Sequence, residues 1–273
     1  MGKAKDLILR PISSKDANAF VRRVHYSGKV VNNSQLHIGV FYQGRLEGAL
    51  QFGPSLDKRK LIGLVEGTGW NEFVELNRMA LTDKLPRNSE SRAIAVSMRL
   101  LRKHAPHLKW VVSFADATQC GDGTIYRASG FVLTGIKKND QIWIAPDGHA
   151  RESRMSLTDN RSKTEQRKAQ TFSRVTATKG KHVTHSAFLR PGIGAIGTAA
   201  SPGGGSSMKA YKDAGFEPLQ GYQLRYIYFL DKSTRQRLTV PEIPFSEIWK
   251  QGAGMYRGER CEQQRADEVY DGA

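Results

Sequence analysis

The sequence predicts an α/β protein with one mixed central β-sheet flanked by helices. Short apolar runs alternate with segments of helical periodicity, in the order strand, helix, hairpin, strand, helix, strand, helix and then strands. A tight Gln43-Gly44-Arg45 turn joins the runs 36–42 and 46–53, which is typical of a β-hairpin. This order favours one mixed-sheet domain over two small ones.

The first elements follow from local signals. An apolar strand at 7–9 is broken by Pro11, and Ser13 or Ser14 can cap a helix from about 15 to 25 with apolar residues at helical spacing. After the hairpin, Pro54 ends the second strand, and a strand is expected at 73–81.

The segment 86–104 is predicted to be a helix. Pro86 precedes it, Asn88 or Ser89 can act as N-cap, and Ile94, Met98 and Leu101 lie on one face. Basic residues cluster at its C-terminal end, where the helix dipole favours cations.

A strand at 110–114 leads through a polar loop to a helix at 124–129 that ends at Gly130. In α/β proteins chemistry often lies where the carboxyl end of a strand opens into a loop. This loop carries side chains that titrate or hydrogen-bond: Ser113, Asp116, Thr118, Gln119 and Asp122. The alternative interpretation is an Asx-type turn with a helix cap.

The composition points to an acidic partner. The net charge is +16 and the pI is near 9.9, which favours nucleic acid or a phosphate-rich cofactor over a merely soluble basic protein. No apolar run approaches the ~20 residues that span a bilayer, and no secretory signal is visible, so no membrane partner is expected. Two distant cysteines exclude a disulfide framework and a Cys-rich zinc site, and an intracellular protein is expected.

Composition also divides the chain. We expect a core domain at 1–136, a basic flexible insertion at 137–206, the C-terminal part of the same domain at 207–250, and a tail at 251–273. Residues 151–181 contain nine Lys or Arg and three Asp or Glu, and a Gly-rich tract follows.

The element order resembles the GNAT acyltransferase fold, in which a helix after the fourth strand binds the pyrophosphate of acyl-CoA. Here that segment is PRNSESRA, which has Ser89, Glu90 and Ser91 where the GNAT loop has glycines. The runs HYSGKVVNNSQLHIGVF, LEGALQFGPSLDKRKLIGLVEGTGWNEFVELNRMAL, WVVSFADATQCGDGTIYRASGFVLTG and YQLRYIYFLDKSTRQRLTVPEIPFS are similar to the Mom family of bacteriophage DNA-modification proteins. The similarity covers about 7–135 and 208–248.

This resemblance implies a GNAT-like fold and a transferase that acts on double-stranded DNA in the cytoplasm of an infected bacterium. The family converts the N6 amino group of adenine to a carbamoylmethyl derivative, which protects the DNA from restriction. The group donor is expected to be an acyl-CoA, by analogy of fold, or an activated glycine such as glycyl-tRNA. A conventional N-acetyltransferase acting on a protein or small amine, and a non-catalytic DNA-binding protein, are the alternatives.

The chemistry indicates candidate residues. Adenine N6 must lose a proton as its new bond forms, and Asp116 is the first candidate for general base, with a capping role as the rival. Ser113 can orient Asp116. The GNAT resemblance makes Tyr126 a proton donor, with packing as the alternative. His25 and Tyr26 end the first helix. Histidine has a pKa suited to proton transfer near neutral pH.

Two further sets complete the expected sites. The cofactor-binding set is Arg87, Asn88, Ser89, Ser91, Arg92 and Asn77. The DNA-binding set is Lys58, Arg59, Lys60, Arg161, Lys163, Arg167 and Lys168. His25, His37, Asp116 and Tyr126 are conceivable metal ligands, but no ligand spacing supports a metal site, and none is assigned. The sequence leaves the oligomeric state open.

Overall fold

The computed structural model describes residues 3–25, 27–144, 146, 151–153, 212, 215–256 and 259–260. The chain forms two compact units. The first contains Met1–His25, Lys29–Lys137 and Gln223–Ala273, and the second contains Tyr26–Gly28 and Lys138–Tyr222. The sites described below belong to the first unit.

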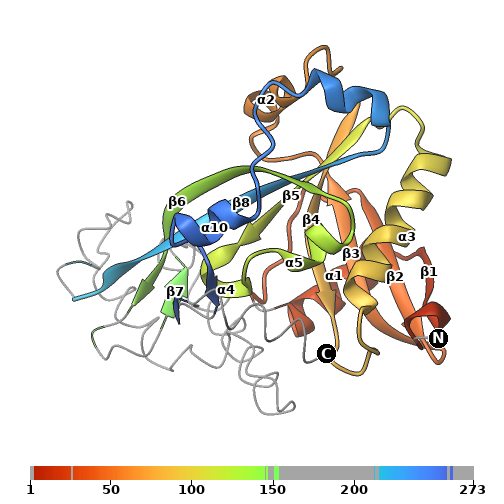
Figure 1. Cartoon of the computed structure of the whole chain (residues 1–273). Coiled ribbons are helices and arrows are strands. Elements are labelled where there is room, and N and C mark those ends of the chain that lie inside the picture. Colours follow the sequence, from red (N-terminus) through yellow and green to blue (C-terminus); the bar gives the residue numbers. More distant parts are fainter. Residues whose placement is uncertain are drawn as a thin grey trace, which may run out of the picture. The chain divides into compact units, whose positions relative to one another are not determined.

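The strands of the main sheet are hydrogen-bonded in the order β1-β2-β3-β4-β5-β8-β6, and β7 pairs with the distal part of β6 (Figure 1). Their bounds are β1 Ile8–Pro11, β2 Leu36–Tyr42, β3 Arg45–Gly53, β4 Phe73–Leu81, β5 Trp110–Asp116, β6 Val132–Ile144, β7 Arg151–Ser153 and β8 Glu217–Phe229. A separate ribbon joins β9 Met255–Tyr256 to β10 Glu259–Arg260. β4 and β5 run parallel, whereas β1 to β4 pair antiparallel. The predicted mixed sheet is confirmed.

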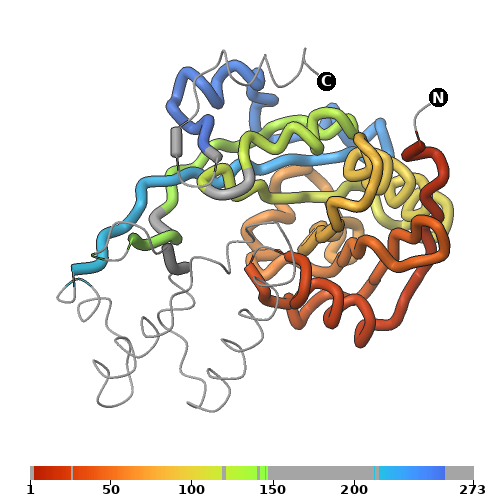
Figure 2. Tube along the Cα trace, turned by 90° about the horizontal axis from the view of Figure 1, so that it is seen from below, coloured from red at the N-terminus to blue at the C-terminus, as the bar shows by residue number. Residues whose placement is uncertain are grey.

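The helices are α1 Ser14–Val24, α2 Lys58–Leu61, α3 Ser89–His104, α4 Ala117–Cys120, α5 Thr124–Ala128 and α10 Ser246–Lys250, with 3-10 turns η1 Lys3–Asp6, η2 Ile62–Leu64 and η4 Lys232–Arg237. The α-carbon trace runs through the N-terminal strands and then through β5, β6 and β8 (Figure 2). Among the described residues, no helix combines the length and apolar character needed to cross a membrane.

The N-terminal half forms as its sequence predicts. The Ser13 side chain caps α1 by accepting a hydrogen bond from the Asp16 amide at 3.1 Å. The hairpin turn has positive φ at Gln43 and Gly44, which matches the twist of paired antiparallel strands. Phe20 and Val21 then pack against Ala49 and Ala80, so α1 covers part of β3 and β4.

The pairing of β4 with β5 is stabilised by an aromatic stack. The rings of Phe73 and Trp110 lie 4.2 Å apart and within 3° of parallel. The indole N–H of Trp110 donates to the hydroxyl of Thr68 at 3.1 Å, so its one polar atom is satisfied. Val112 and Ile227 extend this buried cluster, which fixes the start of both parallel strands.

Register and side-chain contacts put α1 and α3 on opposite faces of the sheet. Gln51 donates to Asn18 of α1 at 2.8 Å, and Gln51 shares its face with Gly53 and therefore with Glu75. Arg102 of α3 donates to the hydroxyl of Tyr228, which pairs with Val111 on the other face of β5. We call these the α1 face and the α3 face.

Several boundaries differ from those predicted. β5 runs to Asp116, so this residue ends the strand instead of following it, and the four-residue helix α4 was not predicted. β6 continues past residue 136, which was the expected end of the core segment, and β8 begins at Glu217. Pairing with neighbouring strands sets these lengths, and a single segment does not encode it.

Candidate functional site

The candidate site is centred on the point where β4 and β5 diverge. Their parallel pairing covers Phe73–Trp110, Val74–Val111 and Glu75–Val112, although β4 continues to Leu81 and β5 to Asp116. The hydroxyl of Ser113 donates to the carbonyl of Leu76 across this divergence at 3.4 Å. Beyond it, the facing backbone edges of the two strands are outside the parallel ladder.

Three polar residues of β4 gather on the α1 face. Strict alternation predicts Glu75 and Asn77 on one face and Arg78 on the other. The prediction is wrong for Arg78. The register shifts at Gln51–Phe52, so that Glu75 pairs with Gly53 and Arg78 pairs with Gln51. The bulge therefore brings Arg78 to the face of Glu75.

The loop between α1 and β2 closes over these residues. Ser34 donates to the side-chain oxygen of Asn77 at 3.1 Å, and Arg78 donates to the carbonyl of Lys29 at 3.3 Å. The side-chain amide of Asn33 donates to the carbonyl of Pro54. Gly53 permits this approach, because a β-carbon there would lie 2.4 Å from the Asn33 carbonyl oxygen. We call the set Ser34, Ser55, Glu75, Asn77 and Arg78 the polar cluster.

Glu75 is the titratable centre of the polar cluster. Burial raises its pKa, while hydrogen bonds from Ser55 and Asn77 and the charge of Arg78 act in the opposite direction. A carboxyl group that is partly desolvated and still hydrogen-bonded is suited to exchange a proton closer to neutral pH than an exposed glutamate.

A second buried polar pair lies on the same face. Gln51 and His37 are both buried, and the Gln51 amide nitrogen lies 3.1 Å from Nδ1 of His37. Because the Gln51 amide donates to Nδ1, a neutral His37 carries its own proton on Nε2. Burial lowers the pKa of His37. The side-chain oxygens of Gln51 and Asn33 are buried and have no hydrogen-bond donor among the described residues.

Asp116 ends β5 and is the N-cap of α4. Its Oδ1 accepts the Thr118 amide at 3.1 Å, and alternation along β5 puts it on the face of Val112 and Phe114. The capping role foreseen for Asp116 is therefore present, and Asp116 makes further contacts. Asp122 has a similar cap, because its Oδ1 accepts from the Thr124 amide at 3.0 Å.

Ser113 and Tyr126 lie on the α3 face, opposite Asp116. Ser113 is fully buried and pairs with Tyr226, whose ring stacks on Tyr126 at 5.2 Å. The ring centroids of Tyr126 and Phe131 lie 5.3 Å apart, and the Tyr126 side chain is 8% exposed. Tyr126 therefore has the packing role considered as the alternative. The sheet thus divides the predicted catalytic residues between its two faces.

The start of α3 lies at the end of the loop that follows β4. Asn88 occupies the N-cap position in the left-handed region, and no side chain of a described residue caps the helix. The hydroxyls of Ser89 and Ser91 instead donate to the carbonyls of Pro86 and Asn88. Uncapped first-turn amides attract anions.

The guanidinium group of Arg92 adds to this preference for anions. Its Nε is buried and has no acceptor among the described residues. Arg87 is near it in the chain, at the helix start, whereas the exposed Glu90 opposes an anion. The local set of donors fits a phosphate group.

The other predicted residues lie elsewhere. His25 follows α1, and its backbone N–H donates to Val21. Lys58, Arg59 and Lys60 form α2 at the opposite end of β4 from α3's start. Tyr26, Arg161, Lys163, Arg167 and Lys168 lie outside the described residues. Within the described part of the chain, no group of three or more His, Cys, Asp or Glu side chains is arranged to hold a metal ion.

Sequence reasoning assigned no site role to Gln51 or Ser55, and it placed Glu75 only on a strand beside the cofactor. The available signal was a polar residue inside an apolar strand, such as Gln51 in the run LEGALQFG. A polar side chain that is buried requires a hydrogen-bond partner. Only the bulge between β3 and β4 shows which side chains come together on the same face.

Comparison with known proteins identifies relatives. The Mom protein family matches residues 6–193. A protein named methylcarbamoylase mom, from Escherichia phage Mu, is 43% identical over 133 residues, which is 48% of this chain and 55% of that protein. The chain thus spans about half the length of this curated relative.

Solved structures of acetyltransferases align at low similarity. A Bacillus subtilis acetyltransferase in complex with CoA has 10% identity and a TM-score of 0.35, over 50% of this chain and 80% of that one. The Vibrio cholerae spermidine/spermine N-acetyltransferase SpeG has 8% identity and a TM-score of 0.39, over 86% and 98%. No activity follows from these values.

Proposed function

Because the chain belongs to the Mom protein family, we propose that it is a transferase that converts the N6 amino group of adenine in phage DNA to a carbamoylmethyl derivative, protecting the DNA from restriction. The observation that carries the proposal is the divergence of β4 and β5. Titratable side chains lie on the α1 face of this divergence, and a helix start suited to phosphate follows β4.

The α1 face would receive the adenine. The N6 lone pair is delocalised into the ring, so a base must remove a proton as the new bond forms. Asp116 is the proposed base, and Glu75 is the second carboxyl group available on that face. The buried side-chain oxygens of Gln51 and Asn33, which accept no hydrogen bond from a described residue, are suited to an amino group. His25, which follows α1, is proposed as a further proton-transfer group of this site.

The α3 face would hold the donor. The phosphate groups of an acyl-CoA would bind at Arg87, Asn88, Ser89, Ser91 and Arg92. Asn77, which was expected in this set, lies instead in the polar cluster on the α1 face. Such a donor supplies an activated acyl carbon when bound. Ser113 would orient groups at the divergence, and Tyr126 would hold a proton near the leaving group.

The product constrains the choice of donor. Its CH₂ carbon is joined to N6, whereas simple acyl transfer joins a carbonyl carbon. An activated glycine such as glycyl-tRNA contains the required atoms. Labelled glycine and labelled acetate, supplied separately to cells that express the protein, would distinguish the two donors by the label found on the modified nucleoside.

The experiment that tests the function is mass spectrometry of nucleosides from DNA of cells that express the protein. We expect a mass increase on deoxyadenosine, and Asp116→Asn should lower its yield about 10²–10⁴-fold, the range for loss of a general base. Asparagine also caps helices, so α4 should be retained. Asp122→Asn is the matched control, since it changes the neighbouring capping aspartate.

The same experiment separates the two alternatives. The positive charge favours a non-catalytic DNA-binding protein, which would leave every nucleoside mass unchanged. The uncapped start of α3 is equally suited to a conventional N-acetyltransferase, which would acetylate protein or a small amine and leave DNA unmodified. Equal loss in both aspartate variants would contradict the assignment of Asp116.

A further inference from the structure

A large cavity lies where β3 ends and β4 begins. Its volume is about 1200 Å³, and its wall includes Gly53–Ser55, the whole basic segment Lys58–Lys60, Trp70 and Phe73. Small-molecule sites typically measure ~300–1,000 Å³, so a nucleotide with part of its flanking backbone can be accommodated. Neither Ser113 nor Asp116 lines this cavity.

The cavity exposes an aromatic ring beside cations. Among the described residues the strongly exposed large hydrophobic side chains are Ile8, Leu56 and Trp70, and the last two line this cavity. Trp70 is 53% exposed, and the ammonium group of Lys58 lies 4.9 Å from its ring centroid. Apolar groups exposed at a cavity indicate a binding surface.

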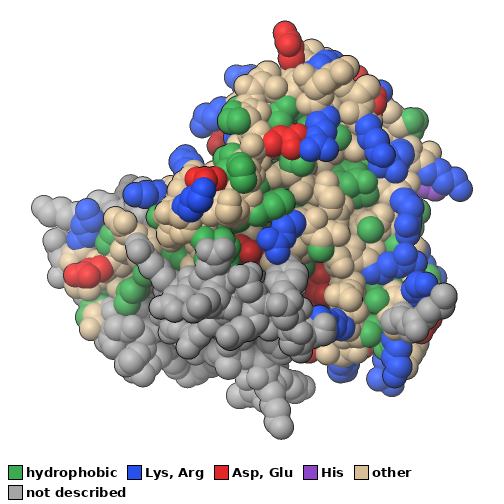
Figure 3. Space-filling model, viewed as in Figure 1, with side chains coloured by type: hydrophobic (Ala, Val, Ile, Leu, Met, Phe, Trp, Pro, Cys, Tyr) green, Lys and Arg blue, Asp and Glu red, His purple; other side chains and the backbone are tan. Residues whose placement is uncertain are grey.

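Two of the three cations of the segment Lys58–Lys60 make no ion pair with a described residue. Lys60 lies 3.6 Å from Asp57, and this pair is strongly exposed. Ion pairs between described residues include neither Lys58 nor Arg59. On the face in Figure 3, basic side chains are spread over the surface instead of gathering in one patch. The feature that distinguishes α2 is therefore the combination of cations with an exposed indole.

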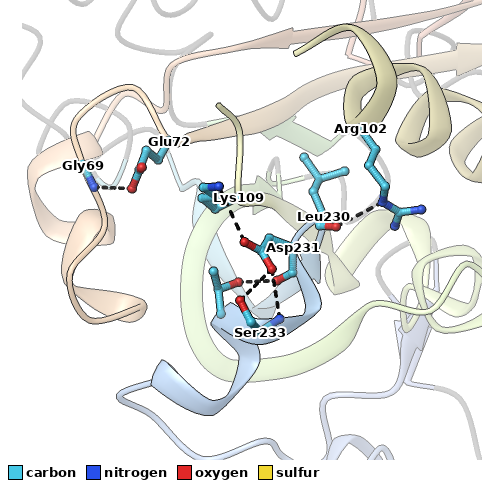
Figure 4. A network of polar contacts seen from close by, with 8 residues as sticks. Gly69, Glu72, Arg102, Lys109, Leu230, Asp231 and Ser233 are labelled. Atoms are coloured by element: carbon cyan, nitrogen blue, oxygen red, sulfur yellow. Dashed lines mark hydrogen bonds and ion pairs between the residues drawn. The ribbon is translucent and has the colours of Figure 1, made fainter. Parts of the chain in front are cut away.

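The loop that carries Trp70 is fixed by hydrogen bonds. The Gly69 amide donates to Oε2 of Glu72 at 2.7 Å, and the Lys109 amide donates to the Glu72 carbonyl at 2.6 Å. Figure 4 shows this loop beside Lys109, whose ammonium lies 3.5 Å from Asp231. A loop whose backbone is held before binding loses less entropy when a base stacks on its aromatic side chain.

We propose that this cavity is a binding site for an unstacked nucleotide, in which the base stacks on Trp70 and the flanking phosphates contact Lys58, Arg59 and Lys60. The proposal rests on the proposed function for its DNA partner and adds a site distinct from the divergence of β4 and β5. Stacking requires a free base face, which a closed duplex does not offer, so the site selects single-stranded or locally opened DNA.

The test is fluorescence anisotropy with a short oligothymidylate, a closed duplex of the same length, and the full chain without any donor. Stacking is worth ~1–3 kcal/mol per base, so Trp70→Ala should weaken oligothymidylate binding about 5–150-fold and leave duplex binding within about twofold. Ile8→Ala, the control at an exposed hydrophobic outside the cavity, should leave both unchanged. Trp70→Phe should restore most of the binding.

Salt dependence tests the interaction with phosphate. For single strands the salt slope should fall by about 0.7 for each phosphate that the variant no longer neutralises, so Lys58→Gln and Arg59→Gln should lower the slope while Trp70→Ala does not. The proposal is overturned if Trp70→Ala leaves oligothymidylate binding unchanged, or weakens duplex binding equally. Because oligothymidylate contains no adenine, this result is independent of whether DNA is modified.

Discussion

The polar cluster and the cavity meet at one short segment, and they differ in how their polar groups are satisfied. Ser55 hydrogen-bonds Glu75 in the cluster, and it also lines the cavity. In the cluster, side chains bind one another and burial shifts the pKa of Glu75. At the cavity, an indole and cations remain accessible. Buried, mutually bonded groups suit proton transfer, whereas exposed groups suit binding of a large anion.

The largest expected effect comes from a substitution at Gly53, in the segment that touches both the polar cluster and the cavity. Gly53→Ala should destabilise the fold by about 1–3 kcal/mol, because the new methyl group meets the Asn33 carbonyl oxygen at 2.4 Å and displaces the loop over the polar cluster. DNA modification should fall. Oligothymidylate binding should fall less, because its base contact is Trp70, although Gly53 also lines the cavity. Urea unfolding measures the first effect, nucleoside mass spectrometry the second, and anisotropy the third.

Gly63→Ala is the matched control for this substitution. A β-carbon at Gly63 meets no atom within 4 Å, and its φ is not positive. Alanine should therefore be neutral or stabilise by about 0.4–1 kcal/mol. If both glycine variants lose the same stability, the close packing of the loop against Gly53 is not what holds the cluster.

The second prediction concerns the start of α3, which binds an anion differently from the cavity. Arg92→Gln removes a guanidinium whose Nε has no acceptor among the described residues, and should weaken CoA binding about tenfold, or ~1.4 kcal/mol. Isothermal titration calorimetry measures this change. Arg99→Gln, at an exposed position on the same helix, should keep the wild-type affinity.

Oligothymidylate affinity should be the same in Arg92→Gln as in the wild type. Equal weakening of CoA and oligothymidylate binding would mean that the two anion sites are not separate.

The smallest effect is a dependence of stability on pH that comes from the α1 face. Burial lowers the pKa of His37 below its ordinary value of 6.5, so the unfolded chain takes up a proton at a higher pH than the folded chain does. The contribution of neutral His37 to the free energy of unfolding is fully present above about pH 6.5. It is lost as the pH falls through the lowered pKa of the folded state. Glu75, with its raised pKa, acts in the opposite sense, and its contribution falls as the pH rises.

His37→Gln should therefore flatten the decrease in unfolding free energy on acidification, measured by urea titration at several pH values. An unchanged profile in His37→Gln would show that the buried imidazole does not titrate with folding.

The sequence by itself determined the elements whose signals are local. Ser13 caps α1, the Gln43-Gly44 turn closes the hairpin, and β4 has the predicted bounds, because capping, turn geometry and apolar periodicity act within a few residues. The net charge likewise required no coordinates. Long sequence motifs led to the family that the comparison with known proteins confirms.

Only the tertiary structure decided how side chains are shared between the two faces of the sheet. One bulge between β3 and β4 brings Arg78 to Glu75, and the regular pairing of β5 separates Ser113 from Asp116. The cavity beside Trp70 likewise requires β3, α2 and the end of α3 to meet. Register depends on pairing between distant segments, and a shift of one residue exchanges the faces of every side chain that follows.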